Sequence, residues 1–270
     1  MTRSRLDAAL VSRGLARSRA QAGDLIRDGV VLVDAHVVGK PSRQVSDAAV
    51  ITLTRKADRW VGRAALKLVR ALELWPIAVA GRRCLDVGAS TGGFTQVLLE
   101  HGASQVTALD VGHGQLVARL ALDPRVIDLQ GTNIRDVDAG SLGGPFDLVV
   151  CDLSFISLTV ALPAIRPLVS DDGDGGDLVV LVKPQFEVGR ERLGRSGVVT
   201  SRDERHRVLR SVHATATRMG LGVRAAAPSP IRGGEGNIEF LLWLAARDRT
   251  PAALSADDML DSIGRQEENS

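Results

Sequence analysis

RCLDVGASTGGFT, residues 83–95, joins an apolar run to a glycine-rich turn and then to a helix-forming segment. Gly88, Gly92 and Gly93 allow the backbone to approach a bound molecule where a Cβ atom would clash. In sheets of parallel strands, ligands bind at the carboxyl ends of the strands, which is where this turn lies if residues 83–87 form a strand. The segment therefore predicts a strand, a ligand-binding turn and a helix in an α/β domain.

Strand-like and helix-like segments alternate from this turn onward. The strand-like runs are RCLDV, QVTALDV, VIDL, FDLVVCDL, DLVVLV, LGVRAAA and NIEFLLWL. Helices are expected over GRAALKLVRALELW, GGFTQVLLEHG, a short segment near 114–121, SLTVALPAIRPL and a long segment near 203–219. This order predicts a parallel, Rossmann-like sheet with helices on both faces. The last two runs follow each other closely, which predicts an antiparallel hairpin at the sheet edge.

The turn suits one class of ligand better than others. It has neither the G-x-G-x-x-G spacing of dinucleotide sites nor the Walker spacing. Asp86 precedes the first glycine and can attract an ammonium or sulfonium group, while Asp110 ends the next strand-like run, where an acid can accept the hydroxyls of a ribose. These residues predict an S-adenosylmethionine site, the alternative being a tight strand-to-helix turn with no ligand. Asn133 lies either near the adenine or in a surface loop.

The N-terminal part differs in charge and pattern from the rest of the 270-residue chain. Residues 1–70 carry 14 Lys and Arg against 6 Asp and Glu, or +8, whereas residues 71–270 carry 20 against 26, or −6. Such asymmetry indicates one polyanion-binding part. Leu6, Leu10 and Val11 recur at helical spacing, and a second helix is expected from an N-cap at Ser18 to Gly29. Short strands follow, so residues 3–54 predict an αα-β module with arginines on its helices.

Composition restricts the other possibilities. Cys84 and Cys151 lie in or beside apolar runs, so we expect core thiols in a reducing compartment and no metal site. Neither a membrane span nor a signal peptide is apparent, which predicts a cytoplasmic protein. We expect a monomer as the simplest state. Residues 247–270 are expected to form a polar tail.

Two lysines and two carboxylates occupy positions where they could act on a hydroxyl group. Asp152 and Lys183 each end a strand-like run, Lys67 lies on the helix that enters the domain, and Glu239 is expected to begin the final strand. Taken singly, each is more typical of a solvated strand or helix end. An alcohol is a weak nucleophile at neutral pH, and a lysine can accept its proton where the surroundings disfavour the ammonium form.

Both parts of the chain resemble known families. Residues 5–45, RLDAALVSRGLARSRAQAGDLIRDGVVLVDAHVVGKPSRQV, are similar to the S4-type RNA-binding domain. Lys67, Asp152, Lys183 and Glu239 resemble the lysine-aspartate-lysine-glutamate tetrad of FtsJ-like RNA 2′-O-methyltransferases. The blocks DVGASTGGFT, CDLSFISL, LVKPQFEVG and GNIEFLLWL are similar to those of the TlyA (hemolysin A) group, which joins the two domains.

The resemblance implies a class I, Rossmann-like methyltransferase fold and an activity. It implies S-adenosylmethionine as cofactor, 16S or 23S ribosomal RNA in ribosomal subunits as partner, 2′-O-methylcytidine as product, and a link to capreomycin and viomycin susceptibility. Lys183 would be the base, Asp152 and Lys67 would set its charge state and grip the ribose, and Glu239 would orient the lysines or the hydroxyl. The cofactor set is Asp86, Gly88, Ser90, Thr91, Gly92, Gly93, Phe94, Asp110, Val111, Asn133 and Asp152. The RNA-binding set is Arg3, Arg5, Arg13, Arg17, Arg19 and Arg63.

The resemblance also sets domain limits and shows one departure. We expect an S4-type domain over 1–55, a linker over 56–62, an FtsJ-like domain over 63–246 and the tail over 247–270. Gly62 and Ala64 stand where the family more often has a serine and a glycine around an arginine. Phe155 and Trp60 are candidates for contacting a flipped nucleotide, although a core position is more usual for Phe155.

Three other functions remain open at this point. The hemolysin designation suggests membrane lysis, for which we find neither an apolar span nor a strongly amphipathic segment. A non-catalytic RNA-binding or ribosome-assembly protein would not need two lysines beside a cofactor cleft. A small-molecule methyltransferase would not benefit from the basic N-terminal part.

Overall fold

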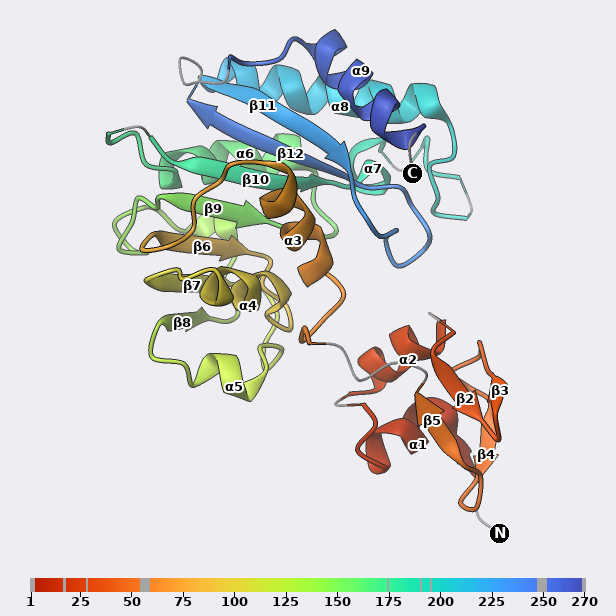
Figure 1. Ribbon diagram of the computed structural model, residues 1–270. Helices are drawn as coiled ribbons and strands as arrows, with labels where there is room; N and C mark the ends of the chain where they lie inside the picture. The colour runs from red at the N-terminus through yellow and green to blue at the C-terminus, as the bar shows by residue number, and fades with distance from the viewer. Residues whose placement is uncertain are drawn as a thin grey trace. The chain divides into compact units, whose positions relative to one another are not determined.

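The computed structural model describes residues 3–16, 18–27, 29–53, 59–173, 175–189, 191–194, 196–246 and 252–268 (Figure 1). The chain divides into two compact units, Met1–Gly62 and Arg63–Ser270.

The first unit places two helices against short strands. Helices α1 (Leu6–Ser12) and α2 (Arg19–Arg27) pack on each other, and the Ser18 hydroxyl accepts a hydrogen bond from Gln21 N at the start of α2, as an N-cap does. Strands β2 (Val31–Val33), β3 (His36–Val37) and β5 (Ile51–Leu53) form a three-stranded sheet in the order β3-β2-β5. The predicted αα-β module is confirmed.

A second, smaller sheet in this unit was not predicted. Strand β1 (Arg3–Arg5) pairs antiparallel with β4 (Gln44–Ser46), so the basic N-terminus is held in extended form. The hydrophobic core of this unit includes Leu6, Leu10, Leu25, Ile26, Val31, Val33, Val38, Val45 and Ile51.

The second unit is a seven-stranded sheet. Its strands are β6 (Arg83–Val87), β7 (Gln105–Leu109), β8 (Val126–Leu129), β9 (Leu148–Cys151), β10 (Asp177–Val182), β11 (Leu221–Pro228) and β12 (Phe240–Ala246). They lie in the order β11-β12-β10-β9-β6-β7-β8. Strands β6 to β10 are parallel, while β12 runs antiparallel to both β10 and β11. The Rossmann-like sheet and its antiparallel edge hairpin are therefore confirmed.

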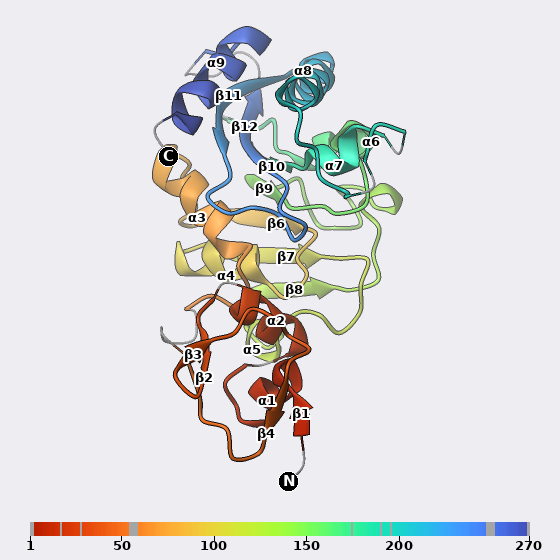
Figure 2. The ribbon, with the colours of Figure 1, turned by 90° about the vertical axis from the view of Figure 1, so that its right-hand side faces the viewer.

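Helices cover both faces of this sheet (Figure 2). Helices α3 (Ala65–Leu74) and α4 (Gly93–Glu100) pack together on one face, and α6 (Leu158–Ile165) packs with α8 (Arg202–Arg218) on the other. Short helical segments complete the connections: α5 (Ala118–Ala121), η1 (Ile134–Asp136), η2 (Arg166–Leu168) and α7 (Pro184–Glu187). The sheet interior is dominated by aliphatic residues, and Cys84 and Cys151 are both free and fully buried in it, as predicted.

Two expectations about the C-terminal part need correction. Within the expected polar tail, helix α9 (Ala256–Glu267) packs on α8 and β11. It buries Met259, Leu260 and Ile263, whose spacing forms an apolar stripe, so this stretch contains a packed helix. The final strand begins at Phe240, so Glu239 immediately precedes it and does not begin it.

Candidate active site

The glycine-rich turn brings the ends of β6 and β9 into contact. Gly88 adopts φ +87°, and a Cβ atom added there would lie 2.8 Å from the carbonyl oxygen of Asp152. Asp152 N in turn donates to the carbonyl of Val87 at 3.0 Å. Glycine at position 88 therefore lets the turn lie directly against the backbone of Asp152.

Asp86 is a fully buried carboxyl group beneath this turn. Its Oδ2 accepts a hydrogen bond of 2.7 Å from the Thr95 hydroxyl on α4. Its Oδ1 accepts none from the described residues and is shielded from solvent. Burial raises the pKa of Asp86 to about 7, with a smaller contribution from the negative charges of Asp152 and Asp110. Asp86 is thus a buried acceptor with unused capacity for a cation.

Asp110 organises the turn from the neighbouring strand. Its carboxylate accepts hydrogen bonds from Ser90 N at 2.8 Å and from Gly112 N at 2.7 Å. Ser90 has φ +48°, and Val111 beside Asp110 is exposed. Asn133 caps η1, because its Oδ1 accepts from Arg135 N. Asp110 therefore joins the turns after β6 and β7, and each of its oxygens retains a second lone pair.

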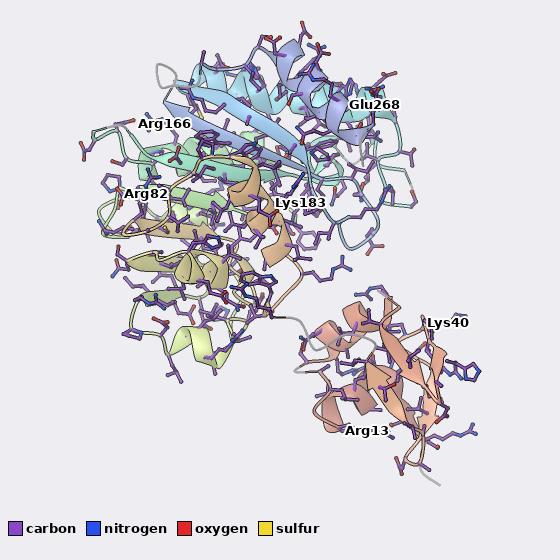
Figure 3. The ribbon with its side chains drawn as sticks, in the orientation of Figure 1. Arg13, Lys40, Arg82, Arg166, Lys183 and Glu268 are labelled. Carbon is purple, nitrogen blue, oxygen red and sulfur yellow. The ribbon has the colours of Figure 1, made fainter. Side chains whose placement is uncertain are left out.

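The two lysines and two carboxylates converge at the carboxyl end of the sheet. Lys67 Nζ on α3 lies 3.3 Å from Asp152 Oδ2 and 2.8 Å from Glu239 Oε2. Lys183, which Figure 3 labels, follows β10. Its Nζ lies 2.6 Å from Asp152 Oδ1. All four side chains are at least nine-tenths buried. We call these residues, Lys67, Asp152, Lys183 and Glu239, the tetrad.

Asp152 is the centre of the tetrad, with one lysine on each carboxylate oxygen. Although burial opposes its ionisation, the ammonium groups of Lys67 and Lys183 hold its pKa below the usual range. Glu239 is held from a second side, since Gln185 Nε2 donates to its Oε1 at 3.4 Å. Two cations and two anions form a neutral set in which Asp152 keeps Lys67 as a partner if Lys183 loses its proton.

One tetrad contact and one contact between the following segments were not assigned from the sequence. The Lys183 ammonium donates to the Ser154 hydroxyl at 2.8 Å. Glu187 on α7 accepts from the Ser157 hydroxyl and from Leu158 N at the start of α6. This contact ties the segment after β9 to the segment after β10. A serine or glutamate a few positions after a strand is too common for its spacing to have shown these roles.

Phe155 lies beside this network but outside the core. It is 91% exposed, has φ +66°, and its ring lies 5.2 Å from the ring of Phe186. The expectation that a core position is more usual is therefore wrong for this residue. A large apolar side chain held in solvent on a left-handed backbone is unusual and points to a ligand-contacting role.

Family comparisons agree with this geometry. The FtsJ-like methyltransferase model matches residues 60–246, and the S4 domain model matches residues 4–51. The 16S/23S rRNA (cytidine-2′-O)-methyltransferase TlyA of Mycobacterium tuberculosis is 51% identical over 97% of this chain and 97% of its own. The chain belongs to the TlyA family of FtsJ-like methyltransferases. Hemolysin A of Brachyspira hyodysenteriae is 36% identical over 88% of this chain and 98% of its own.

A solved structure supports the TlyA-family architecture. It comes from Streptococcus thermophilus, bears a hemolysin name, is 36% identical and covers 99% of this chain and 97% of its own with a TM-score of 0.77. Among the residues that the present structure describes, no helix is long and apolar enough to cross a membrane. The same residues contain no cluster of three or more His, Cys, Asp or Glu side chains arranged to hold a metal ion.

Ala64, one of the two residues that depart from the family pattern, lies where the start of α3 meets the start of α4. Ala64 precedes α3, and a Cβ atom added to Gly93 would lie 3.0 Å from Ala65 N and 3.5 Å from the Ala64 side chain. Small residues here allow the start of the helix that carries Lys67 to lie against the start of α4. Arg63 Nη2 donates to the carbonyl of Arg232.

The arginines expected to bind RNA fall into different structural situations. Arg5 and Arg19 both contact the buried carboxylate of Asp7, at 2.8 and 3.1 Å. Arg13 instead donates to three backbone carbonyls of the turn between β4 and β5, which is a structural role. Arg3 lies exposed on β1. Arg17 lies outside the described residues.

We expect Asp7→Asn to lower the thermal stability of the S4 unit at about pH 7, because Arg5 and Arg19 lose their shared partner. The hydrogen bond from Arg5, aided by Arg19, holds the pKa of Asp7 well below its usual range. A lowered pKa stabilises the fold above the unfolded value of about 4, and this contribution is lost as the pH falls towards the folded value. The melting-temperature gap between variant and wild type should therefore shrink at about pH 3.

Asp47→Asn is the matched control, since Asp47 is an exposed aspartate of the same unit. Its melting temperature should equal that of the wild type at both pH values. A gap for Asp7→Asn that is equally large at both pH values would contradict the assigned charge interaction.

Proposed function

We propose that this protein transfers a methyl group from S-adenosylmethionine to the ribose 2′-oxygen of a cytidine in 16S or 23S ribosomal RNA. The observation that carries the proposal is the buried tetrad at the carboxyl end of the sheet, directly beside the glycine-rich turn. Two lysines and two carboxylates in that position suit the deprotonation of a hydroxyl group beside a cationic methyl donor.

Each tetrad residue has a distinct part in this proposal. Lys183 Nζ, in its neutral form, would accept the proton of the 2′-hydroxyl, and the methyl group lost from sulfur to that oxygen would leave S-adenosylhomocysteine as the second product. Asp152 orients Lys183 and stays paired with Lys67, so no buried carboxylate is left without a cation. Glu239 fixes Lys67 from the other side at 2.8 Å. Ser154 gives Lys183 a second polar contact that limits its rotation.

The residues around the glycine-rich turn fit S-adenosylmethionine. The unused, buried Oδ1 of Asp86 suits the ammonium group, and Asp110 retains acceptor capacity for ribose hydroxyls. The cofactor supplies a methyl group made electrophilic by the sulfonium charge. The remaining proposed contacts are Gly88, Ser90, Thr91, Gly92, Gly93, Phe94, Val111, Asn133 and Asp152.

Ribosomal RNA as substrate follows from the family and from the first unit. The Mycobacterium tuberculosis relative is named for both 16S and 23S rRNA, and one from Campylobacter jejuni is named for 23S rRNA. The S4 domain and the excess of positive charge in residues 1–70 suit a structured polyanion. Arg3, Arg5, Arg17, Arg19 and Arg63 are the proposed phosphate contacts. The exposed Phe155 is proposed to contact the target nucleotide once that nucleotide has flipped out of the base stack of the RNA.

Cofactor affinity is expected to increase as the pH is raised from about 6 to about 7.5. Burial raises the pKa of Asp86 to about 7, so the carboxyl is mostly protonated at the lower pH and mostly ionised at the higher one. Only the ionised form attracts an ammonium group, so the affinity should rise several-fold, with proton release on binding at the lower pH. Calorimetry in buffers of different ionisation enthalpy measures both effects. The Asp86→Asn variant should bind S-adenosylmethionine weakly, with an affinity that does not depend on pH. If its affinity rises with pH as steeply as that of the wild type, Asp86 is not the titrating group.

The activity is tested by transfer of labelled methyl from S-adenosylmethionine to purified small subunits, large subunits and free ribosomal RNA. We expect incorporation into at least one of them by the wild type and none above background by Lys183→Ala. Calorimetry with S-adenosylmethionine runs in parallel on both proteins. Cofactor binding without methyl transfer to any ribosomal substrate would favour the alternative of a non-catalytic RNA-binding protein.

A further inference from the structure

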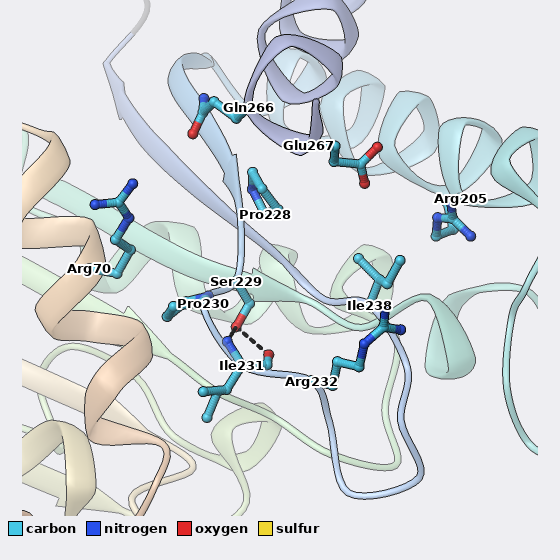
Figure 4. A pocket seen from close by; sticks show the side chains of 10 residues that line it. All are labelled: Arg70, Arg205, Pro228, Ser229, Pro230, Ile231, Arg232, Ile238, Gln266 and Glu267. Carbon is cyan, nitrogen blue, oxygen red and sulfur yellow. Dashed lines mark hydrogen bonds between the residues drawn. The ribbon is translucent and has the colours of Figure 1, made fainter. Parts of the chain in front are cut away.

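A cavity of about 820 Å³ lies in the methyltransferase unit, outside the tetrad. Arginines from three separate elements line it: Arg70 from α3, Arg205 from α8 and Arg232 from the connection between β11 and β12 (Figure 4). Figure 4 shows them on different sides of the cavity. Glu267 of α9 is the acidic residue among the lining side chains, so positive charge predominates.

No tetrad residue lines the cavity, but two elements that carry tetrad residues also form its wall. Arg70 lies one helical turn after Lys67 on α3. On the other side, Ser229 of the cavity wall donates its N–H to the carbonyl of Glu239 at 2.8 Å. The cavity wall and the tetrad therefore share neighbouring residues of α3 and of the segment before β12.

Two of the three arginines are anchored to backbone carbonyls, and Arg70 has one longer contact with an exposed glutamate. Arg205 Nη1 donates to the carbonyl of Thr200 at 2.7 Å, Arg232 Nη1 donates to Gly236 O at 3.1 Å, and Arg70 Nη1 lies 3.8 Å from Glu73. A guanidinium group has five N–H donors, so each retains capacity for an external acceptor. Guanidinium groups gathered around one cavity suit the paired oxygens of phosphates.

We propose that this cavity binds backbone phosphates of the substrate RNA that flank the target nucleotide. The inference rests on the proposed function and adds an RNA contact within the methyltransferase unit, separate from the S4 domain. Proline and isoleucine side chains form other parts of the wall, so a ribose or base can pack between the arginines. Helix α9 contributes Gln266 and Glu267 to the wall, which gives this C-terminal helix a part in building the cavity.

The test is a double variant, Arg70→Gln with Arg232→Gln, assayed as the full chain on ribosomal subunits. We expect the KM for the RNA substrate to rise about tenfold, with kcat at saturation and cofactor affinity unchanged, because the arginines bind RNA and do not touch the reacting atoms. The slope of log affinity against log salt should fall in magnitude by about 1 to 2. The control is Arg207→Gln with Arg218→Gln, which removes the same charge from exposed positions of α8 outside the cavity.

Direct RNA binding separates this inference from the proposed function. Affinity for free 16S and 23S rRNA is measured by filter binding, which needs no methyl transfer. A loss of affinity in the cavity variant but not in the control supports the inference even if no variant transfers methyl. Equal losses in both, or none in either, overturn it. Inorganic phosphate or nucleoside triphosphate that binds the wild type but not the cavity variant, with RNA affinity unchanged, would also overturn it in favour of a small anion.

Discussion

Replacing Lys183 with alanine is expected to lower the single-turnover rate of methyl transfer by about 100- to 10,000-fold, the usual range for loss of a general base. Lys183 Nζ contacts both Asp152 and Ser154, and the alanine removes the proposed proton acceptor. Asp152 stays paired with Lys67 at 3.3 Å, so the variant should fold. Cofactor binding, which the proposal assigns to other residues, should change by no more than about twofold as judged by calorimetry.

Lys183→Arg distinguishes a proton acceptor from a simple cation. Arginine keeps the positive charge beside Asp152 but does not lose its proton near neutral pH. The Lys183→Arg variant should therefore be as stable as the wild type, but its rate of methyl transfer should stay low. Full turnover by Lys183→Arg would exclude the proton-acceptor role and leave Lys183 as an electrostatic contact.

Replacing Asp152 with asparagine is expected to lower both activity and stability. Asp152 is the only described carboxylate that contacts Lys183, so the variant leaves this ammonium buried with neutral partners, the amide at position 152 and the Ser154 hydroxyl. Breaking a buried ion pair by removing one member typically costs about 3 to 5 kcal/mol. Denaturant unfolding of the full chain should show the loss in the transition of the methyltransferase unit, and methyl transfer should fall to background.

A second substitution tests whether the unpaired ammonium is the cause. Adding Lys183→Met to Asp152→Asn removes that ammonium, so part of the lost stability should return while activity stays absent. Asp203→Asn, which changes an exposed residue of α8, is the control. It should unfold at the same denaturant concentration as the wild type. If Asp152→Asn unfolds at the wild-type denaturant concentration, the ion pairs described here do not stabilise the fold.

The sheet could be predicted because parallel strands buried on both faces are nearly continuous apolar runs. The runs ending at Val87, Cys151 and Val182 show this, and the polar residues after them predicted where the site forms. Strands β1 and β4 were missed because each has three residues and carries polar side chains, so neither forms an apolar run. Helix α9 was missed because its apolar stripe is short and the surrounding residues are charged.

The site was predictable in position but not in its contacts. Spacing alone placed Lys67 and Asp152 on separate elements, and only the fold shows that they meet at 3.3 Å. Arg13 has the same side chain as Arg5, yet it bonds to backbone carbonyls of a distant turn. The exposure of Phe155 also depends on the local backbone, because a φ of +66° cannot be read from the residue type.

The central claim is that the acceptor atom is a ribose 2′-oxygen, and alkaline hydrolysis of the labelled RNA tests it most directly. Alkali cleaves RNA through the free 2′-hydroxyl, so a methylated 2′-oxygen protects the bond that follows it. The account predicts that the label from wild-type reactions appears in an alkali-resistant dinucleotide that begins with cytidine. Label recovered in a mononucleotide as a methylated base would contradict it.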